Sequence, residues 1–423
     1  MEVLGNRIIN GVLKAVPGIR DPHHARELLT RDINIIVDPG RLMDPYDLWP
    51  ALWALTSVLA RQFEGVIFIS GTEKPSYPSP REFDRKCIFG APPHSSGAIR
   101  IGLGAAPDGR DSIWGDARGS SVSYRKSMEC SGSAHPISAF ALAGYLGFAA
   151  LAEAVGIPAS RAAFATAELD LPFDPGVAPG STDYTFVGLG HLGQAYLSLL
   201  FFLDRQGAGT RQIVLVDRDE FGKENLSTQI LLGDDLLWEG SDKAQFLASH
   251  MRNIGVEAKG ESVRVSWGWK RPGYHPPLAI LGLDNFDARR MAIEAGYEWI
   301  FEAGLSSSFE QPRLTWHSVP PGRESAKIFP RQVREAKVDV GMERDFIQNL
   351  LESPGRCGWL TYLSVTASAP SMGLVAAAYL WCEVLTFLGG VRSTVSGAAR
   401  LWPPLIPFYR ESCSCVILDA PET

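Results

Sequence analysis

The chain has 423 residues, of which 45% are hydrophobic and 21% charged, and its formal net charge is −7. This composition is typical of a folded protein with room for two domains, and it excludes global disorder. The negative charge argues against a general nucleic-acid-binding protein, because such proteins carry clustered positive charge.

The first residues show no basic stretch followed by an apolar run, so no secretory signal is predicted. None of the six cysteines forms a Cys-x-x-Cys pair, which argues against a structural zinc site. A cytoplasmic location with free cysteines is therefore expected, with neither a membrane nor a nucleic acid as partner.

In the N-terminal part, residues 44–63 are predicted to form a helix capped by Asp44, with proline at the second position. Residues 65–70 and 98–104 are predicted strands, and no glycine-rich phosphate loop joins a strand to a helix here. The apolar stretch 137–152 is too short to cross a bilayer comfortably and is rich in Ala and Gly. It is predicted to be a buried, close-packed helix.

Residues 170–182 are dense in Pro and Gly and are predicted to be a linker. After it, short apolar strands alternate with helices, which predicts an α/β domain with a doubly wound, mostly parallel, Rossmann-like sheet. The predicted strands are residues 184–187, 212–217, 278–284 and 299–305, and the predicted helices are residues 191–203 and one starting at Ala288.

Two small-residue helices, each begun by a proline, resemble one another. Aligned on Pro136 and Pro370, they share Ala, Tyr and Leu at three equivalent positions, which include Tyr145 and Tyr379. Two interpretations stay open: a similarity expected of any two alanine-rich core helices, or a degenerate duplication. In the second, residues 1–178 form an inactive adenylation-like domain without a nucleotide loop, and residues 179–423 form the active one.

The first chemical motif is a Gly-x-Gly-x-x-Gly loop between a predicted strand and a helix, formed by Gly188, Gly190 and Gly193. The first glycine makes a tight turn, the second lets phosphate approach the backbone, and the third lets helix and strand pack closely. Alone, this loop fits NAD and FAD enzymes equally well.

The next predicted strand ends in Asp217, a suitable acceptor for a ribose hydroxyl. Four polar residues follow that a dehydrogenase does not need: Asp219, Asn225, Gln229 and Lys243. They suit a triphosphate with magnesium, because carboxylates hold the metal, amides grip phosphate oxygens and lysine offsets charge on the leaving pyrophosphate. An NAD-dependent oxidoreductase is therefore disfavoured.

The third motif is Leu-Asp-Asn-Phe-Asp-Ala-Arg-Arg, beginning at Leu283. Asp284 ends a predicted buried strand, where ligands bind in open parallel sheets, so it is a candidate magnesium ligand. The alternative is that Asp284 or Asp287 only caps the following helix. The presence of the other two motifs favours the metal.

Together these blocks resemble the ubiquitin-activating enzyme family, which includes the ThiF and MoeB adenylyltransferases of thiamine and molybdopterin synthesis. The matching blocks are Gly-x-Gly-x-x-Gly, Asp-x-Asp, Asn-Leu-x-x-Gln, Gly-x-x-Lys-Ala and Leu-Asp-Asn-x-x-Ala-Arg, in that order between Tyr184 and Gly390. The resemblance implies a reaction in which the C-terminal glycine carboxylate of a small protein attacks ATP. Its products would be pyrophosphate and an acyl-adenylate.

The resemblance also implies residue roles. Asp217 would bind the ribose, Asp284 would hold Mg²⁺, and the phosphates would be lined by Asp219, Asn225, Gln229 and Lys243. Asp219 and Lys243 would take part in catalysis.

One position departs from the family pattern, because Thr228 stands where the family usually has arginine. A replacement cation is therefore expected to point into the site. Arg289 and Arg290 are candidates within the motif itself. An arginine lent by the N-terminal half is the other possibility, with three candidates: Arg20, Arg26 and Arg31.

Cys357 lies among Pro and Gly residues beside Arg356, which would favour its thiolate. The Cys-Gly pair followed by Ala-Pro-Ser-Met-Gly resembles bacterial activating enzymes that carry ubiquitin-like proteins as thioesters, so Cys357 is the predicted catalytic cysteine. An inert loop cysteine is the alternative interpretation. Cys130 is the rival nucleophile, and Cys382 is expected to belong to the core.

The sequence thus predicts an ATP- and Mg²⁺-dependent activating enzyme for a ubiquitin-like protein ending in glycine, which it would pass to a conjugating enzyme. Bacterial pathways of this type suggest an antiviral role. Two alternatives stay open: an adenylyltransferase for sulfur-carrier proteins without a thioester step, and a non-catalytic nucleotide-binding partner.

Overall fold

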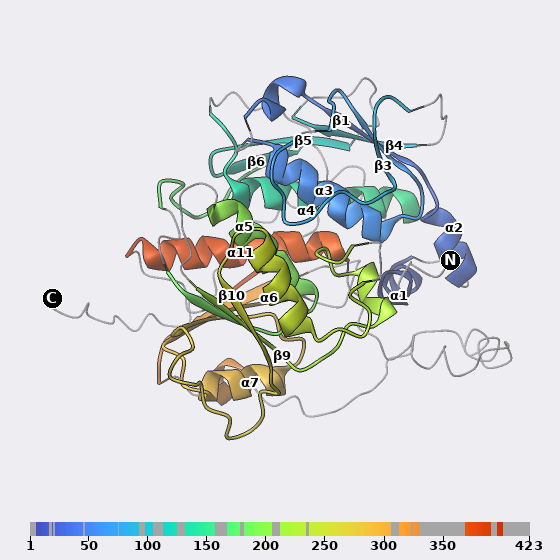
Figure 1. The fold of residues 1–423 in the computed structure, drawn as a ribbon. Coiled ribbons are helices and arrows are strands. Elements are labelled where there is room, and N and C mark those ends of the chain that lie inside the picture. The colour runs from blue at the N-terminus through green and yellow to red at the C-terminus, as the bar shows by residue number, and fades with distance from the viewer. Residues whose placement is uncertain are drawn as a thin grey trace, which may run out of the picture.

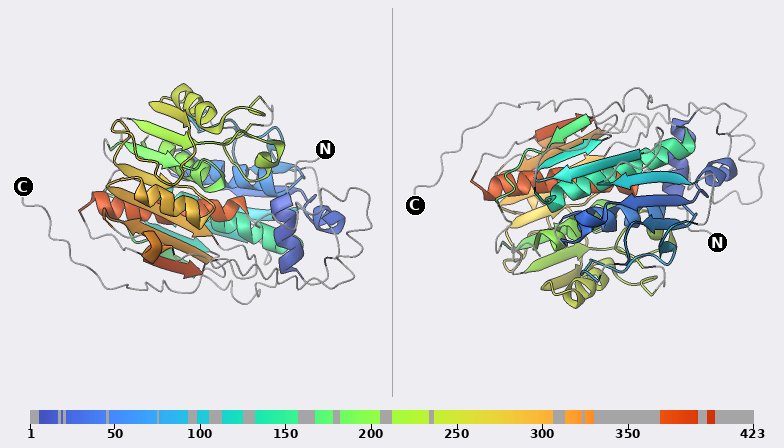
Figure 2. Two further views of the ribbon diagram at one scale, coloured as in Figure 1. Left: turned by 90° about the horizontal axis from the view of Figure 1, so that it is seen from below. Right: turned by 90° about the horizontal axis from the view of Figure 1, so that it is seen from above.

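Two seven-stranded sheets with helices packed between and around them make up the fold, seen here in a computed structural model (Figures 1 and 2). The predicted α/β class with doubly wound, mostly parallel sheets is confirmed. The structure describes residues 6–16, 19, 22–44, 47–74, 76–92, 98–104, 113–124, 132–156, 167–177, 182–204, 212–233, 237–305, 313–322, 325–329, 369–390 and 396–400.

The first sheet has the strand order β3-β2-β1-β4-β5-β6-β7, and with its helices we call it the first unit. Its strands are β1 (Ile33–Val37), β2 (Ile67–Ser70), β3 (Cys87–Phe89), β4 (Ile99–Leu103), β5 (Ile113–Arg118), β6 (Ser121–Tyr124) and β7 (Ala167–Asp170). Its helices are α1 (Asn6–Ala15), α2 (Pro22–Leu28), the short 3-10 helix η1 (Pro39–Leu42), α3 (Trp49–Gln62) and α4 (Pro136–Val155).

The second sheet has the order β10-β9-β8-β11-β12-β13-β14 and, with its helices, forms the second unit. Its strands are β8 (Tyr184–Val187), β9 (Ile213–Asp217), β10 (Ala258–Ser262), β11 (Leu278–Leu281), β12 (Trp299–Leu305), β13 (Arg313–Val319) and β14 (Ser396–Arg400). Its helices are α5 (His191–Leu203), the 3-10 helix η3 (Lys223–Ser227), α6 (Lys243–Asn253), α7 (Phe286–Glu294), α8 (Ser325–Ile328) and α11 (Pro370–Leu388).

Strand order and strand direction are the same in both units. In each, the first five strands pair in parallel, and the sixth strand is antiparallel to both of its neighbours. Helix α4 precedes the last strand of the first unit as α11 precedes that of the second. This agreement favours a duplication over a chance similarity between two core helices.

Helices α3, α4, α5 and α11 pack against one another between the two sheets (Figure 1). Helices α4 and α11 approach closely at glycine: a Cβ added at Gly144 would lie 2.7 Å from the carbonyl oxygen of Ser371. The hydroxyls of Tyr145 and Tyr379, the pair aligned from sequence, are 3.3 Å apart and hydrogen-bonded. Burial raises the pKa of Tyr145 to about 12, so its hydroxyl stays protonated at neutral pH.

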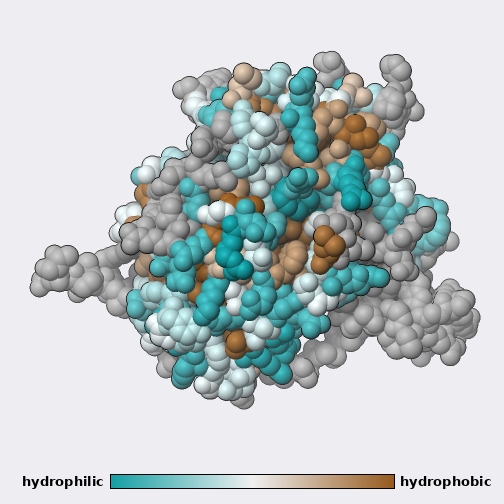
Figure 3. Space-filling view, viewed as in Figure 1, coloured by the Kyte–Doolittle hydropathy of each residue, from teal (hydrophilic) through white to brown (hydrophobic). Residues whose placement is uncertain are grey.

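The two central helices, α4 and α11, are long and apolar enough to cross a membrane, yet 94% and 83% of their apolar windows are buried inside the protein. The prediction of a buried helix over residues 137–152 is therefore confirmed. Both helices belong to one hydrophobic core that also includes residues of both sheets. On the face drawn in Figure 3, hydrophobic residues form scattered patches among hydrophilic ones.

Several predicted elements are confirmed with small shifts of boundary. Helix α5 and strands β8 and β12 have the predicted bounds, whereas β11 ends at Leu281 rather than at residue 284. The prediction that Asp44 caps a helix is wrong, because α3 begins at Trp49 after Leu48, without a side-chain cap. A proline in the first turn, Pro50, fits this later start because its nitrogen needs no hydrogen-bond partner there.

We predict that Gly144→Ala lowers the free energy of unfolding by about 1–3 kcal/mol, the usual cost of overpacking a core. The added methyl would lie 2.5 Å from Cγ2 of Val375 and close to the backbone of α11, which cannot move aside cheaply. Denaturant unfolding measures the change. Glu153→Ala, at an exposed position of the same helix, is the control. Equal stability of the two variants would contradict the close contact of the helices.

Candidate functional site

The glycine loop joins β8 to α5 at the carboxyl edge of the second sheet. Gly188 has a φ of 88°, in the left-handed region that glycine favours. A Cβ at Gly193 would lie 2.2 Å from the Gly188 carbonyl oxygen, so helix and strand can pack only with glycine there. Nothing lies within 4 Å of a Cβ built at Gly190, the N-cap of α5, so the backbone at this point is open to a ligand.

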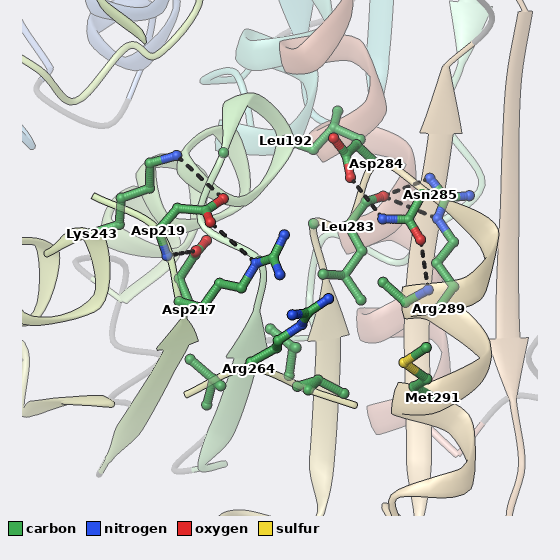
Figure 4. Close-up of a pocket in the computed structure, with 18 of the residues that line it drawn as sticks. Leu192, Asp217, Asp219, Lys243, Arg264, Leu283, Asp284, Asn285, Arg289 and Met291 are labelled. Atoms are coloured by element: carbon green, nitrogen blue, oxygen red, sulfur yellow. Dashed lines mark hydrogen bonds and ion pairs between the residues drawn. The ribbon is translucent and has the colours of Figure 1, made fainter. Parts of the chain in front are cut away.

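A pocket of about 820 Å³ opens at this edge, where open parallel sheets bind ligands. The structure brings together in its lining eight of the residues predicted from sequence: Gly188, Gly190, Asp217, Asp219, Asn225, Gln229, Lys243 and Asp284. In Figure 4, the labelled residues that follow β9 lie on one side of the pocket, and those that follow β11 lie on the other.

Asp217, the last residue of β9, ties two loops of the pocket together. Its carboxylate accepts the backbone N–H of Leu189 at 2.6 Å and that of Asp219 at 2.9 Å. Burial raises the pKa of the Asp217 carboxyl, while these two N–H groups act in the opposite direction. Because each carboxylate oxygen can accept more than one hydrogen bond, Asp217 can still bind a hydroxyl from the pocket.

Lys243 brings a shielded positive charge to the side of the pocket that follows β9. It is the first residue of α6, after Asp242, which caps the helix. Its ammonium lies 4.0 Å from a carboxylate oxygen of Asp219, and its side chain is 10% exposed, against 56% for that aspartate. An exposed partner of this kind holds the lysine weakly, so the ammonium can turn toward an anionic ligand.

The amides of Asn225 and Gln229 are held by hydrogen bonds, the first within its own segment and the second from helix α5. Oδ1 of Asn225 accepts the N–H of Gly222 at 3.0 Å. Nε2 of Gln194 donates a hydrogen bond to Oε1 of Gln229 at 2.6 Å. Oε1 of Gln194 accepts a hydrogen bond from the N–H of Leu231 at 3.0 Å. Gln194, on α5, therefore fixes both the side chain of Gln229 and the backbone that follows it.

Asp284 is exposed, just beyond β11, and does not cap the next helix. The cap is Asn285, whose Oδ1 accepts the N–H of Ala288 at 2.7 Å. Helix α7 accordingly begins at Phe286, two residues earlier than predicted, and the alternative role of Asp284 or Asp287 as cap is wrong. The Asp284 carboxylate is thus available to a ligand in the pocket.

Arg289 lines the pocket, but its guanidinium supports the loop before Asp284. Its Nε and Nη2 lie 3.0 and 2.9 Å from the carbonyl oxygen of Leu283, and its Nη1 lies 2.9 Å from Glu302. Glu302 is also hydrogen-bonded by His317. This buried network keeps Arg289 occupied, so it is a poor substitute for the missing arginine at Thr228.

Of the other predicted cations, those that the structure describes are not among the residues that line the pocket. Arg26 pairs with Glu64 at 2.7 Å, and Arg290 donates to the carbonyl of Phe329. Arg31 is exposed and is not among the lining residues, and Arg20 lies outside the described residues. Among the residues that the structure describes, the pocket lining contains none from the first unit.

Arg264 is a lining residue that the sequence did not reveal. It follows β10 and points into the pocket, with Asp217 and Asp219 on one side and Asp284 on the other (Figure 4). The strand before it, Ala258–Ser262, is polar and charged, so its pattern gave no strand signal. Arg218 also lines the pocket and lies 3.2 Å from Asp219.

The predicted cysteine nucleophile, Cys357, and its rival Cys130 lie outside the described residues. Cys382 is fully buried in α11, as predicted for a core residue. Burial raises the pKa of the Cys382 thiol well above its usual value, which disfavours the reactive thiolate.

The family described as the BilD C-terminal domain matches residues 178–391, half of the chain, including every residue of the pocket lining. The chain belongs to this family. Its relative from Collimonas sp. (strain OK412), named bacterial E1-like protein BilD, is 31% identical over 220 residues, which are 51% of this chain and 47% of the relative. The chain thus spans about half the length of the curated relative that it matches.

Solved structures of E. coli MccB are among those to which this chain is similar. The structure with AMPCPP and MccA has a TM-score of 0.36 at 13% identity, covering 54% of this chain and 62% of that one. The structure with ATP has a TM-score of 0.35 at 13% identity, covering 64% and 70%.

The glycine loop gives a testable prediction about phosphate binding. Gly190→Val should fold with nearly wild-type thermal stability, because its side chain enters open space at an ordinary φ of −74°. It should lose binding of Mg²⁺–ATP in calorimetric titration, because the side chain fills the approach to the helix N-terminus. Gly193→Ala, which strikes backbone instead, should lower thermal stability. Wild-type ATP affinity in Gly190→Val would contradict phosphate binding at this loop.

Proposed function

We propose that this chain is an ATP-dependent activating enzyme that adenylates the C-terminal glycine of a ubiquitin-like protein. One observation carries the proposal: polar residues from separate sequence blocks line a single pocket beside an open glycine loop. Membership of a family whose relative is named E1-like supports it. In this proposal the reaction takes place in the cytoplasm.

In the proposed reaction, a carboxylate oxygen of the glycine attacks the α-phosphorus of ATP. The bond from that phosphorus to the β-phosphate oxygen breaks, and pyrophosphate leaves with the electron pair. Negative charge grows on the leaving group, so a cation nearby stabilises the transition state more than the ground state. Lys243 suits this role, with Arg264 as the second cation in place of the arginine absent at Thr228.

The remaining residues would bind and orient ATP. Asp217 would accept a ribose hydroxyl, and the phosphates would lie over Gly190 at the N-terminus of α5. Asn225 and Gln229 would contact phosphate oxygens from the segment that lies beyond β9. Holding the α-phosphorus in line with the incoming carboxylate removes much of the entropic barrier.

The pocket fits Mg²⁺ held mainly by the nucleotide. The described residues include no cluster of three or more His, Cys, Asp or Glu side chains that would form a metal cage. Mg²⁺ is commonly bound by one or two carboxylates together with substrate phosphates and water. Asp284, exposed and free of a capping role, would be that carboxylate, and the ion would neutralise phosphate charge.

We further propose that the glycine is transferred from AMP to Cys357 as a thioester and then to a conjugating enzyme. The thiolate would attack the acyl carbon, and AMP would leave with the electrons of the broken acyl–phosphate bond. The motif around Cys357 motivates this step, and the alkaline shift in the pKa of buried Cys382 argues against that residue as nucleophile. In this proposal the pathway serves antiviral defence.

Adenylation predicts ATP–pyrophosphate exchange that depends on a ubiquitin-like protein encoded beside this chain. Asp284→Ala should abolish exchange because the metal carboxylate is lost, and Lys243→Ala should slow it roughly a hundredfold or more, as for one lost transition-state contact. Glu298→Gln removes an exposed carboxylate that does not line the pocket and is the control. Exchange by Asp284→Ala at the wild-type rate would refute the metal assignment, and preference for NAD over ATP would refute the function.

The thioester step predicts a conjugate with the ubiquitin-like protein that a reducing agent cleaves. Cys357→Ala should lose the conjugate and keep pyrophosphate exchange, since adenylation precedes thiol attack. Cys382→Ala tests the loss of a cysteine as such and should keep both. Loss of the conjugate in Cys130→Ala alone would assign the nucleophile to Cys130. Exchange without any cysteine conjugate would favour the sulfur-carrier type of adenylyltransferase.

A further inference from the structure

Two arginines of the first unit contact the backbone of the segment that carries Gln229. Arg61, at the end of α3, donates Nη2 to the carbonyl of Leu232 at 2.5 Å and Nε to that of Gln229 at 3.4 Å. Arg81 donates Nε to the carbonyl of Ile230 at 2.5 Å. Three of four consecutive carbonyls in the second unit are therefore held by side chains of the first.

A shared carboxylate orients both guanidinium groups. Asp84 accepts Nη1 of Arg61 at 3.0 Å through one oxygen and Nη2 of Arg81 at 2.7 Å through the other. The side chains of Arg61 and Asp84 are 1% exposed, and that of Arg81 is 6% exposed. Hydrogen bonds donated by ionised groups in a buried site are stronger than those at the surface, and their geometry is more restricted.

One residue of the segment that they hold, Gln229, lines the pocket. The backbone N–H of Leu231, in the same segment, bonds to Gln194, which also holds the side chain of Gln229. The position of Gln229 is thus fixed from two directions, by α5 of its own unit and by the arginines of the first unit. No lining residue comes from the described part of the first unit, so any effect of that unit on the pocket is indirect, and these hydrogen bonds to the backbone offer a route for it.

We propose that Arg61 and Arg81 are positioning residues through which the first unit sets the phosphate-binding segment of the second. The proposal rests on the proposed function for the nature of the ligand, ATP, although the contacts themselves do not depend on it. Both arginines bind backbone carbonyl groups, and neither lines the pocket. This differs from the expected arrangement, in which an arginine of the N-terminal half points into the site.

Each arginine can be removed singly without leaving a buried charge alone, because Asp84 keeps the other as partner. Arg81→Ala should raise the Kd for Mg²⁺–ATP about tenfold, the scale of losing a hydrogen bond from a charged donor. Arg81→Lys, which keeps the charge but lacks the planar fork, should recover only part of that affinity. Gln62→Ala is the matched control, since Gln62 also crosses between the units but bonds to Ser371.

A double-mutant cycle separates positioning from general stability. If Arg81 acts through Gln229, Arg81→Ala should add no further loss of ATP affinity in a Gln229→Ala background. Hydrogen exchange of the Leu231 amide gives a readout without nucleotide. It should become at least tenfold faster in Arg81→Ala and stay unchanged in Gln62→Ala, because the carbonyls around it are no longer held.

Two outcomes would overturn this role: unchanged ATP affinity in folded Arg81→Ala protein, or effects of Arg81→Ala and Gln229→Ala that simply multiply. If the wild-type protein does not bind ATP, the proposed function fails. The inference is then decided by hydrogen exchange alone, and equal exchange of the Leu231 amide in Arg81→Ala and wild-type protein would refute it.

Discussion

The close packing of α4 against α11 is the contact on which the rest of the molecule depends. One face of each sheet packs against this layer of helices, so the two units share a single hydrophobic core instead of meeting at a polar interface. Such an approach requires small residues, and Gly144 and Gly147 both lie where a Cβ would press on α11. Because the units cannot separate without exposing that core, their relative position is fixed, and the first unit can support the site in the second.

The two units have the same strand order, but the loops that follow their first strands differ. The loop after β8 is open at Gly190, whereas the loop after β1 leads into η1 and Arg41. Arg41 is buried and pairs with Asp47 at 2.5 Å and with Asp116 at 2.6 Å. After β1, the first unit thus has a buried guanidinium paired with two carboxylates, whereas the second unit has a pocket beside the loop after β8. The shared strand order is the feature that favours a duplication, and loss of the nucleotide loop in the first unit stays a prediction.

Much of the second unit could be predicted from sequence. Buried parallel strands are short apolar runs, and the glycine loop depends on glycines close together in the sequence. Helix α5 and strand β12 have the predicted bounds for this reason. Strand β10 was missed because Lys259 and Glu261 give it a charged pattern, and with it Arg264 was missed. The helix α7 is capped by Asn285 rather than by Asp284 or Asp287. This was missed because the apolar run made the preceding strand seem to end at residue 284, whereas β11 ends at Leu281.

Contacts between distant segments could not be read from sequence at all. Arg61 and Gln229 are 168 residues apart, and nothing local distinguishes a guanidinium that holds carbonyls from one in solvent. The resemblance directed attention to arginines that enter the site, and Arg26 instead pairs on the surface of its own unit. Side chains that act on backbone leave no pattern of spacing, so this kind of support is visible only in a structure.

The charges of the pocket explain why a metal ion would have to accompany a triphosphate. The described lining contains four carboxylates, Asp217, Asp219, Asp284 and Asp287, and four cations, Arg218, Lys243, Arg264 and Arg289. Several of these already compensate one another, as Arg218 does with Asp219, and Arg289 is held by Glu302. A nearly neutral lining cannot offset the charge of three phosphates, and the carboxylates would repel them. In the proposed function, Asp284 would hold a divalent ion that also binds phosphate, and the positive charge of this ion would offset the repulsion between carboxylates and phosphates.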